Sequence, residues 1–224
     1  MDNYNYYKGM NGIIQELTGL LKTKNIGTDS DRALLLDFQA TLETKPEKAI
    51  KLEKDALAQI ENITADNARL VSNLHANLGG LYRMNGHPDL AREHMEKSIS
   101  LLDQFNLLHI NDSIPQIANY AMFLTEQQEP ERGISELQKL SGIIKEYHSD
   151  ECLDYAKVQE NLATIYLMTA NLSQAKTHFK KAFKIYEKIW ADEPEMIEAK
   201  YREIQELYPQ IGFSIGKTLS GLLT

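Results

Sequence analysis

The sequence of 224 residues has one cysteine, one tryptophan and six prolines. The single Cys152 cannot form an internal disulfide, and it cannot build a zinc site that needs several thiolates. Basic residues are in deficit, because 24 Lys and Arg face 32 Asp and Glu for a net charge of −8, which argues against a nucleic-acid partner. No apolar run approaches the ~18 residues of a membrane span, and residues 1–10 lack a signal-peptide pattern. We therefore expect a soluble, cytoplasmic protein with no membrane partner.

The chain carries an internal repeat with a period of 42 residues. The motif Leu-Gly-x-x-Tyr at 78–82 reappears as Leu-Ala-x-x-Tyr at 162–166. Halving the offset between these copies finds Tyr-Ala-x-x-Leu at 120–124, and one more step back finds Leu-x-x-x-Ala at 36–40. Because no insertion or deletion separates the copies, chance is a poor explanation. The four units begin near Ser30, Ser72, Ile114 and Ala156.

Each unit is predicted to be a hairpin of two helices. Apolar residues recur at helical spacing in its first half, a polar turn follows, and a second helical pattern begins after the turn. Pro46, Pro88 and Pro130 stand where the second helices would begin, a position at which the missing N–H costs least. Small residues recur where two helices must approach closely, and large ones fill the space beside them. The small residues are Gly79, Ala91, Ala121, Gly133, Ala163 and Ala175, and the large ones are Tyr82, Leu137, Tyr166 and Phe179.

This pattern of a small residue beside Leu, then Tyr, then Ala and an aromatic on the second helix resembles the tetratricopeptide repeat. The resemblance covers roughly residues 30–190 and is strongest around Leu78 and Leu162. The period is roughly eight residues longer than the usual 34, and it looks like that of kinesin light chains and bacterial peptide-pheromone receptors. The resemblance implies an all-α, right-handed α–α superhelical solenoid of about four hairpins with capping helices, which acts by binding proteins rather than by catalysis.

The repeat also predicts the domain organisation. An N-terminal capping helix is expected within 1–29 and four repeats within 30–193, followed at 194–224 by a C-terminal capping helix and an apolar tail helix. The expected repeat boundaries are approximately 30–71, 72–113, 114–155 and 156–193.

One polar position repeats on the first helix of three units, at Asn77, Asn119 and Asn161. A side-chain amide offers a donor and an acceptor, which matches the N–H and C=O of an extended peptide backbone. Neighbouring helices pack ~8–10 Å apart, so one Asn per repeat would engage a bound peptide at intervals of several residues. In the resembled receptors and light chains such a row of asparagines holds peptide backbone, and the resemblance implies this role here. The alternative is that each Asn bonds to the adjacent repeat.

Side-chain selectivity is expected from neighbours of the asparagines on the same face. The predicted peptide-binding neighbours are Asn73, Met84, Met122, Glu126, Lys157 and Met168, with Phe38, Gly80 and Thr164 beside them. Methionines would be adaptable apolar contacts, although methionine at helical spacing also fits a core. A clamp for a terminal carboxylate needs several basic residues around the Asn, and only Lys157 qualifies. We therefore expect no recognition of a peptide C-terminus.

The sequence contains no recognisable catalytic, cofactor-binding or metal-binding constellation. The six histidines lack paired ligand spacing, and His94 and His178 are expected to pack beside Met95 and Phe179. A basic strip is interpreted as a solvated helix face; it consists of Lys176, Lys180, Lys181, Lys184 and Lys188. We therefore expect a non-enzymatic protein whose partner is a protein or peptide segment. The alternative is a self-assembly scaffold in which the apolar tail, 211–222, fills its own groove or that of a second copy in a homodimer.

Overall fold

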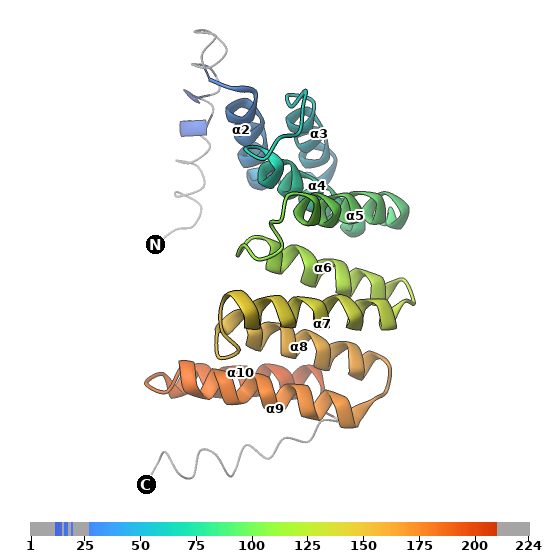
Figure 1. Cartoon of the computed structure of the whole chain (residues 1–224), viewed down its shortest axis with the longest axis vertical. Helices are drawn as coiled ribbons and strands as arrows, with labels where there is room; N and C mark the ends of the chain where they lie inside the picture. The colour runs from blue at the N-terminus through green and yellow to red at the C-terminus, as the bar shows by residue number, and fades with distance from the viewer. Residues whose placement is uncertain (1–11, 15, 18, 20–26, 210–224) are drawn as a thin grey trace. The chain divides into compact units, whose positions relative to one another are not determined.

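The structure is a computed structural model, and it describes residues 12–14, 16, 17, 19 and 27–209 (Figure 1). All regular structure in these residues is helical, as predicted. Residues 12–14, 16, 17 and 19 are helical as well. The later helices are α2 (Asp29–Leu42), α3 (Pro46–Leu57), α4 (Ala68–Met84), α5 (Pro88–Gln104), α6 (Ser113–Glu126), α7 (Pro130–Tyr147), α8 (Leu153–Met168), α9 (Leu172–Ile189) and α10 (Pro194–Leu207).

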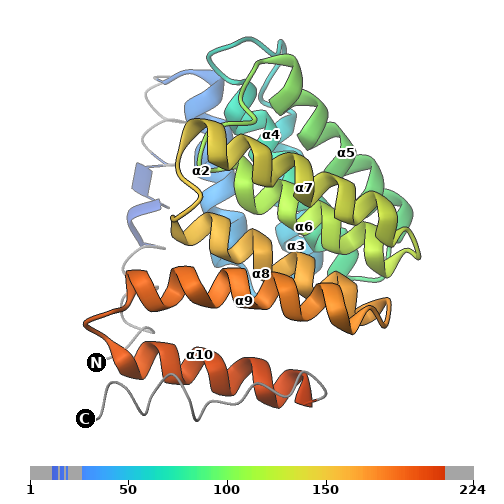
Figure 2. The same cartoon turned by 60° about the horizontal axis from the view of Figure 1, so that its bottom comes forward.

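The chain divides into two compact units, Met1–Tyr120 and Ala121–Thr224, and the division falls within α6. In the first unit α2 packs on α3, α3 on α4, and α4 on α5. In the second unit α7 packs on α8, α8 on α9, and α9 on α10 (Figure 2). Within each unit these helices therefore contact their neighbours in the chain, which is the arrangement expected of stacked hairpins.

The hairpins form because local sequence signals, mainly prolines, determine where the second helices begin. Pro46, Pro88 and Pro130 are the first residues of α3, α5 and α7, as predicted, and Pro194 begins α10 in the same way. Some other helices have side-chain caps. Thr28 forms a capping box with Asp31 at the start of α2, and the Cys152 sulfur accepts from the backbone N–H of Tyr155 at the start of α8.

The small residues do lie where helices meet closely. A Cβ added to Gly79 on α4 would come within 2.6 Å of Met95 Cγ on α5. A Cβ added to Gly133 on α7 would come within 2.5 Å of the carbonyl oxygen of Ala121 on α6. Both distances are below normal van der Waals contact, so these crossings depend on the missing side chain.

Histidine, tyrosine and one further polar side chain form a packed group that occurs once in each unit. In the first unit His94 stacks on Tyr82, with ring centroids 5.4 Å apart, and its Nδ1 lies 2.8 Å from His75 Nδ1. Burial and then the charge of His94 lower the pKa of His75 to about 4. These histidines are therefore packing residues, as the sequence predicted for His94.

The second unit repeats this group 84 residues later. His178 stacks on Tyr166 with centroids 5.3 Å apart, and its Nδ1 lies 2.9 Å from Gln159 Oε1. Gln159 therefore takes the place that His75 has in the first unit. The prediction that His178 is a packing residue agrees with these contacts.

The turns inside three hairpins share a left-handed residue. Gly86, Gln128 and Ala170 occupy the same repeat position and have φ of 73°, 66° and 58°. In each turn the next N–H bonds back five residues, for example from Asn171 to the Tyr166 carbonyl at 2.7 Å, which is the pattern of a Schellman motif. Glycine adopts this conformation without a Cβ clash, whereas Gln128 and Ala170 are strained there.

Replacing Ala170 by Gly is therefore expected to raise the free energy of unfolding by about 1 kcal/mol. Urea denaturation followed by the fluorescence of Trp190 measures this change. The reverse substitution, Gly86→Ala, is the matched control, because a Cβ at Gly86 meets no atom within 4 Å and adds only the backbone strain. It should cost a similar amount by circular dichroism. Equal stability of both variants and the parent protein would show that a non-glycine residue is not strained at this turn position.

The expected tail helix, 211–222, lies outside the described residues, as does most of the expected N-terminal cap. Among the helices of 27–209, none is both long and apolar enough to cross a membrane.

Candidate functional site

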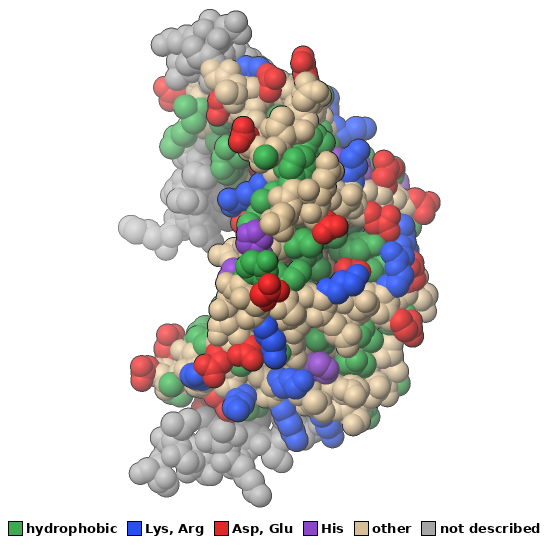
Figure 3. Space-filling view, viewed as in Figure 1, with side chains coloured by type: hydrophobic (Ala, Val, Ile, Leu, Met, Phe, Trp, Pro, Cys, Tyr) green, Lys and Arg blue, Asp and Glu red, His purple; other side chains and the backbone are tan. Residues whose placement is uncertain are grey.

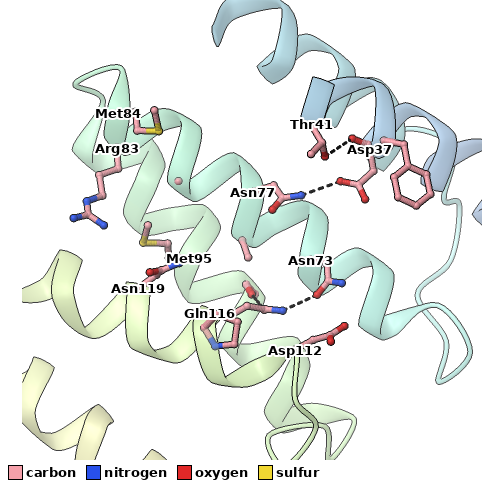
Figure 4. Close-up of a pocket in the computed structure, with 15 residues that line it drawn as sticks. Asp37, Thr41, Asn73, Asn77, Arg83, Met84, Met95, Asp112, Gln116 and Asn119 are labelled. Carbon is pink, nitrogen blue, oxygen red and sulfur yellow. Dashed lines mark hydrogen bonds between the residues drawn. The ribbon is translucent and has the colours of Figure 1, made fainter. Parts of the chain in front are cut away.

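The first unit has a groove of about 600 Å³ on the face formed by α2, α4 and the start of α6 (Figure 4). Four of the predicted binding residues line it, Asn73, Asn77, Met84 and Asn119, together with the expected neighbours Phe38 and Gly80. The other lining residues are Asp37, Thr41, Ala76, Arg83, Met95, Ser98, Asp112, Pro115 and Gln116. Both polar and apolar side chains line the groove, and among them Phe38 and Met84 are large exposed apolar ones.

The periodicity of α4 divides its side chains between the core and the groove. Leu74 and Leu78 are fully buried, and Asn73, Asn77 and Met84 follow the opposite stripe at spacings of four and seven residues. Met84 is 81% exposed, so this methionine is not a core residue. The structure thus brings these predicted residues into one groove on one unit.

Asn77 is held by two carboxyl groups from the preceding hairpin. Its Nδ2 donates to Asp37 Oδ1 on α2 at 2.9 Å (Figure 4). The same Nδ2 donates to Glu53 Oε1 on α3 at 3.1 Å. This is the contact with an adjacent repeat that the alternative interpretation of the asparagines expected. No hydrogen bond within the described residues is made by the Asn77 side-chain oxygen.

Asp37 and Glu53 form an acidic pair in which Asp37 is half-buried and Glu53 is buried. Glu53 is 2% exposed, and its Oε2 is buried with no hydrogen-bond partner among the described residues. Burial and then the charge of Asp37 raise the pKa of Glu53 to about 8, and burial also raises the pKa of Asp37. At neutral pH the pair therefore holds one proton, mainly on Glu53, and carries about one negative charge.

The sequence analysis missed this pair, although the repeat contains its signal. Asp37 stands at the position of Gly79, Ala121 and Ala163, and Glu53 stands at that of Met95, Leu137 and Phe179. In the other three repeats these positions hold a small residue and a large apolar one. The first hairpin alone has two acids where the others interlock small and large side chains.

Asn73 is bound within the protein. Its Oδ1 accepts from Gln116 Nε2 at 2.6 Å, and Gln116 Oε1 in turn accepts from Ser72 at 2.8 Å and Ser98 at 2.5 Å. This network joins α4, α5 and α6 within the first unit. It uses the Asn73 oxygen, so Asn73 has a structural role that the sequence did not predict.

Asn119 differs from the other two groove asparagines. It is exposed on α6, lines the groove, and makes no side-chain hydrogen bond within the described part of the chain. Both its donor and its acceptor therefore face solvent in the groove.

The other five predicted binding residues lie on the second unit. Asn161 on α8 is half-buried and has no side-chain hydrogen bond to any described residue. Met122 is half-buried, Glu126 is exposed, and Met168 is 53% exposed. Lys157 is exposed and lies 3.9 Å from Asp154 one turn earlier.

The basic strip of α9 is exposed, as predicted (Figure 3). Lys181, Lys184 and Lys188 line a smaller cavity of about 260 Å³ in the second unit, together with Asp150 and Glu151. Lys188 forms an ion pair with Glu151. Acidic residues therefore offset part of the strip. Among the described residues, no three His, Cys, Asp or Glu side chains are grouped as a metal site requires.

Comparisons with known proteins agree with this architecture. Residues 113–188 match the family model of the tetratricopeptide repeat. BtubC (BKLC) from P. vanneervenii has a similar structure, with a TM-score of 0.69 and 19% identity over 81% of this chain and 72% of that one. A search of curated protein sequences finds no match.

Two further solved structures share the fold. A variant of a Podosopora anserina protein described as a kinesin light chain, with nearly identical TPR-like repeats, has a TM-score of 0.65 and 16% identity over 84% of this chain and 92% of that one. MamA has a TM-score of 0.56 and 16% identity over 84% and 96%. These matches confirm the predicted resemblance and the all-α fold of repeated helical hairpins.

Proposed function

We propose that the groove of the first unit binds an extended segment of another protein, which is the kind of partner expected of a chain whose residues 113–188 match the tetratricopeptide-repeat family model. The side-chain amide of Asn119 would hold the backbone of that segment. Asn77 would add its oxygen as an acceptor, while Asp37 and Glu53 fix its orientation.

The observation that carries this proposal is that the exposed side-chain amide of Asn119 makes no hydrogen bond within the described residues. An exposed amide with no internal partner can donate to a peptide C=O and accept from a peptide N–H at once. Phe38 and Met84, which are 43% and 81% exposed, supply apolar contacts on the same groove. An unsatisfied backbone-matching group in a groove that also presents exposed apolar side chains is the arrangement that an extended peptide fits.

We extend the proposal to the second unit through the equivalent residue of the repeat. Asn161 follows Asn119 by 42 residues and also has no side-chain hydrogen bond within the described residues. Its amide would hold peptide backbone in the same manner. Met122, Glu126, Lys157 and Met168 would contribute to the choice of side chains.

The test is to select peptides from a phage-displayed random library on the full chain and to measure their affinity by fluorescence polarisation. Asn119→Ala is expected to weaken binding about tenfold, because two hydrogen bonds to the peptide are lost. Gln104→Ala is the control, since Gln104 is an exposed amide on α5 that does not line the groove. Selected peptides that bind Asn119→Ala as tightly as the parent protein would reject the proposal. Unchanged circular dichroism of the variant would show that folding is intact.

A further inference from the structure

The acidic pair Asp37–Glu53 has no basic partner among the residues that the structure describes. Neither residue forms an ion pair with any Lys, Arg or His of the described chain. The other acid of the groove is neutralised, because Asp112 lies 2.6 Å from Arg69. Asp37 is therefore an acid on the groove wall whose charge nothing in the described chain balances.

This pair also stands where apolar packing is expected. Two acids replace the small and large residues that the same positions hold in the other three hairpins. Burying carboxyl groups in place of an apolar contact costs stability. A residue choice that opposes the fold in this way commonly marks a binding site.

From these observations, and on the basis of the proposed function, we infer that Asp37, with Glu53 behind it, receives a basic side chain of the segment bound in the groove. A Lys ammonium or Arg guanidinium would supply the missing positive charge and displace the proton that the pair shares. Phe38, the next residue on α2, is 43% exposed and offers an aromatic face for such a cation.

The position of Met84 places an apolar residue at a short distance from this basic one. Met84 follows Asn77, the partner of Asp37, by seven residues on α4, which corresponds to roughly 10 Å along the helix. An extended peptide covers that distance in about three residues. The occupant is therefore a segment with a Lys or Arg and an apolar residue about three positions apart.

The experiment uses the full chain and the peptides selected from the random library. We expect Lys or Arg to be enriched at one position, and replacement of that residue by Met to weaken binding at least tenfold. Asp37→Asn should weaken the binding of the basic peptide to a similar extent and leave the Met-substituted peptide unaffected. Asp55→Asn is the matched control, because Asp55 is an acid of α3 that is paired with Lys51 and does not line the groove, and it should change the affinity less than threefold.

The possible results separate this inference from the function on which it rests. Peptides that lose affinity for Asn119→Ala but show no basic residue, or bind Asp37→Asn unchanged, would overturn the inference and leave the groove as a peptide site. An equal effect of Asp37→Asn on both peptides would also overturn it, because the effect would then be structural. If no selected peptide depends on Asn119, both proposals fail.

Discussion

The double substitution Asp37→Ala with Glu53→Leu is expected to raise the free energy of unfolding by about 3 kcal/mol at pH 7. It gives the first hairpin the same residues as Ala121 and Leu137 in the third repeat. Total side-chain volume changes little, so the new pair should pack without strain. Asn77 loses two acceptors, but it is exposed and can bond to water instead.

The expected gain depends on pH in a defined direction. The pKa of Glu53 is raised in the folded protein from its ordinary 4.5 to about 8. Between these values the folded chain keeps a proton on Glu53 that the unfolded chain releases. The stability that this proton contributes is therefore fully present below pH 4.5 and is lost as the pH rises to about 8. The double variant has no carboxyl group at position 53, so it does not lose this stability as the pH rises. Its advantage should be large at pH 8 and should shrink toward pH 4.5.

Urea denaturation followed by circular dichroism, at pH 5 and pH 8, measures this difference. The histidine pair, whose own pKa shifts cost stability in acid, is present in both proteins and cancels in the comparison. Glu53→Gln is the control that removes ionisation without adding apolar packing, and it should show the same pH dependence with a smaller gain. A double variant that is less stable at pH 8 would show that the acids stabilise the hairpin.

Phe179→Ala is expected to lower the free energy of unfolding by about 3–5 kcal/mol. Phe179 on α9 is fully buried, and it stands at the repeat position that Glu53 has in the first hairpin. Its neighbours include Tyr208, with ring centroids 6.2 Å apart. Truncation leaves a cavity in the packed second unit, which relaxes only in part.

Trp190, the single tryptophan, stacks on Tyr186 at the end of α9 and therefore reports unfolding of the second unit. Phe179→Leu, the residue of the third repeat, should cost about 1–2 kcal/mol. Phe38→Ala, on the exposed groove face, should change stability by less than about 0.5 kcal/mol. A small loss of unfolding free energy in Phe179→Ala would mean that the large side chain at this repeat position is dispensable.

These two predictions concern the same repeat position, and they show where prediction from the sequence succeeded. Pro88 and Pro130 begin their helices as expected, because a proline acts on its own turn of backbone. Gly79 lies where two helices approach closely, as expected, because it follows the helical period of a hairpin with short connections. The conformation of the turns was predicted less completely, because the left-handed residue is Gly86 in one hairpin but Gln128 and Ala170 in two others.

The groove shows where the sequence was insufficient. Asn77 and Asn119 occupy the same repeat position and looked equivalent, yet one is held by two carboxyl groups and the other is bound to nothing in the described chain. The acids at 37 and 53 break the repeat visibly in the sequence. Their significance depends on a contact between α2, α3 and α4, and no local sequence pattern predicts this contact.

The sequence by itself determined the helices, their pairing and the period, because propensity, capping and apolar spacing act within one hairpin. Only the tertiary structure decided which polar side chains are satisfied and which face the groove. Hydrogen bonds and burial depend on distances between residues from different hairpins, and small shifts in helix packing set those distances. The state of an asparagine is therefore a property of its neighbours, while the helix that carries it is a property of its own sequence.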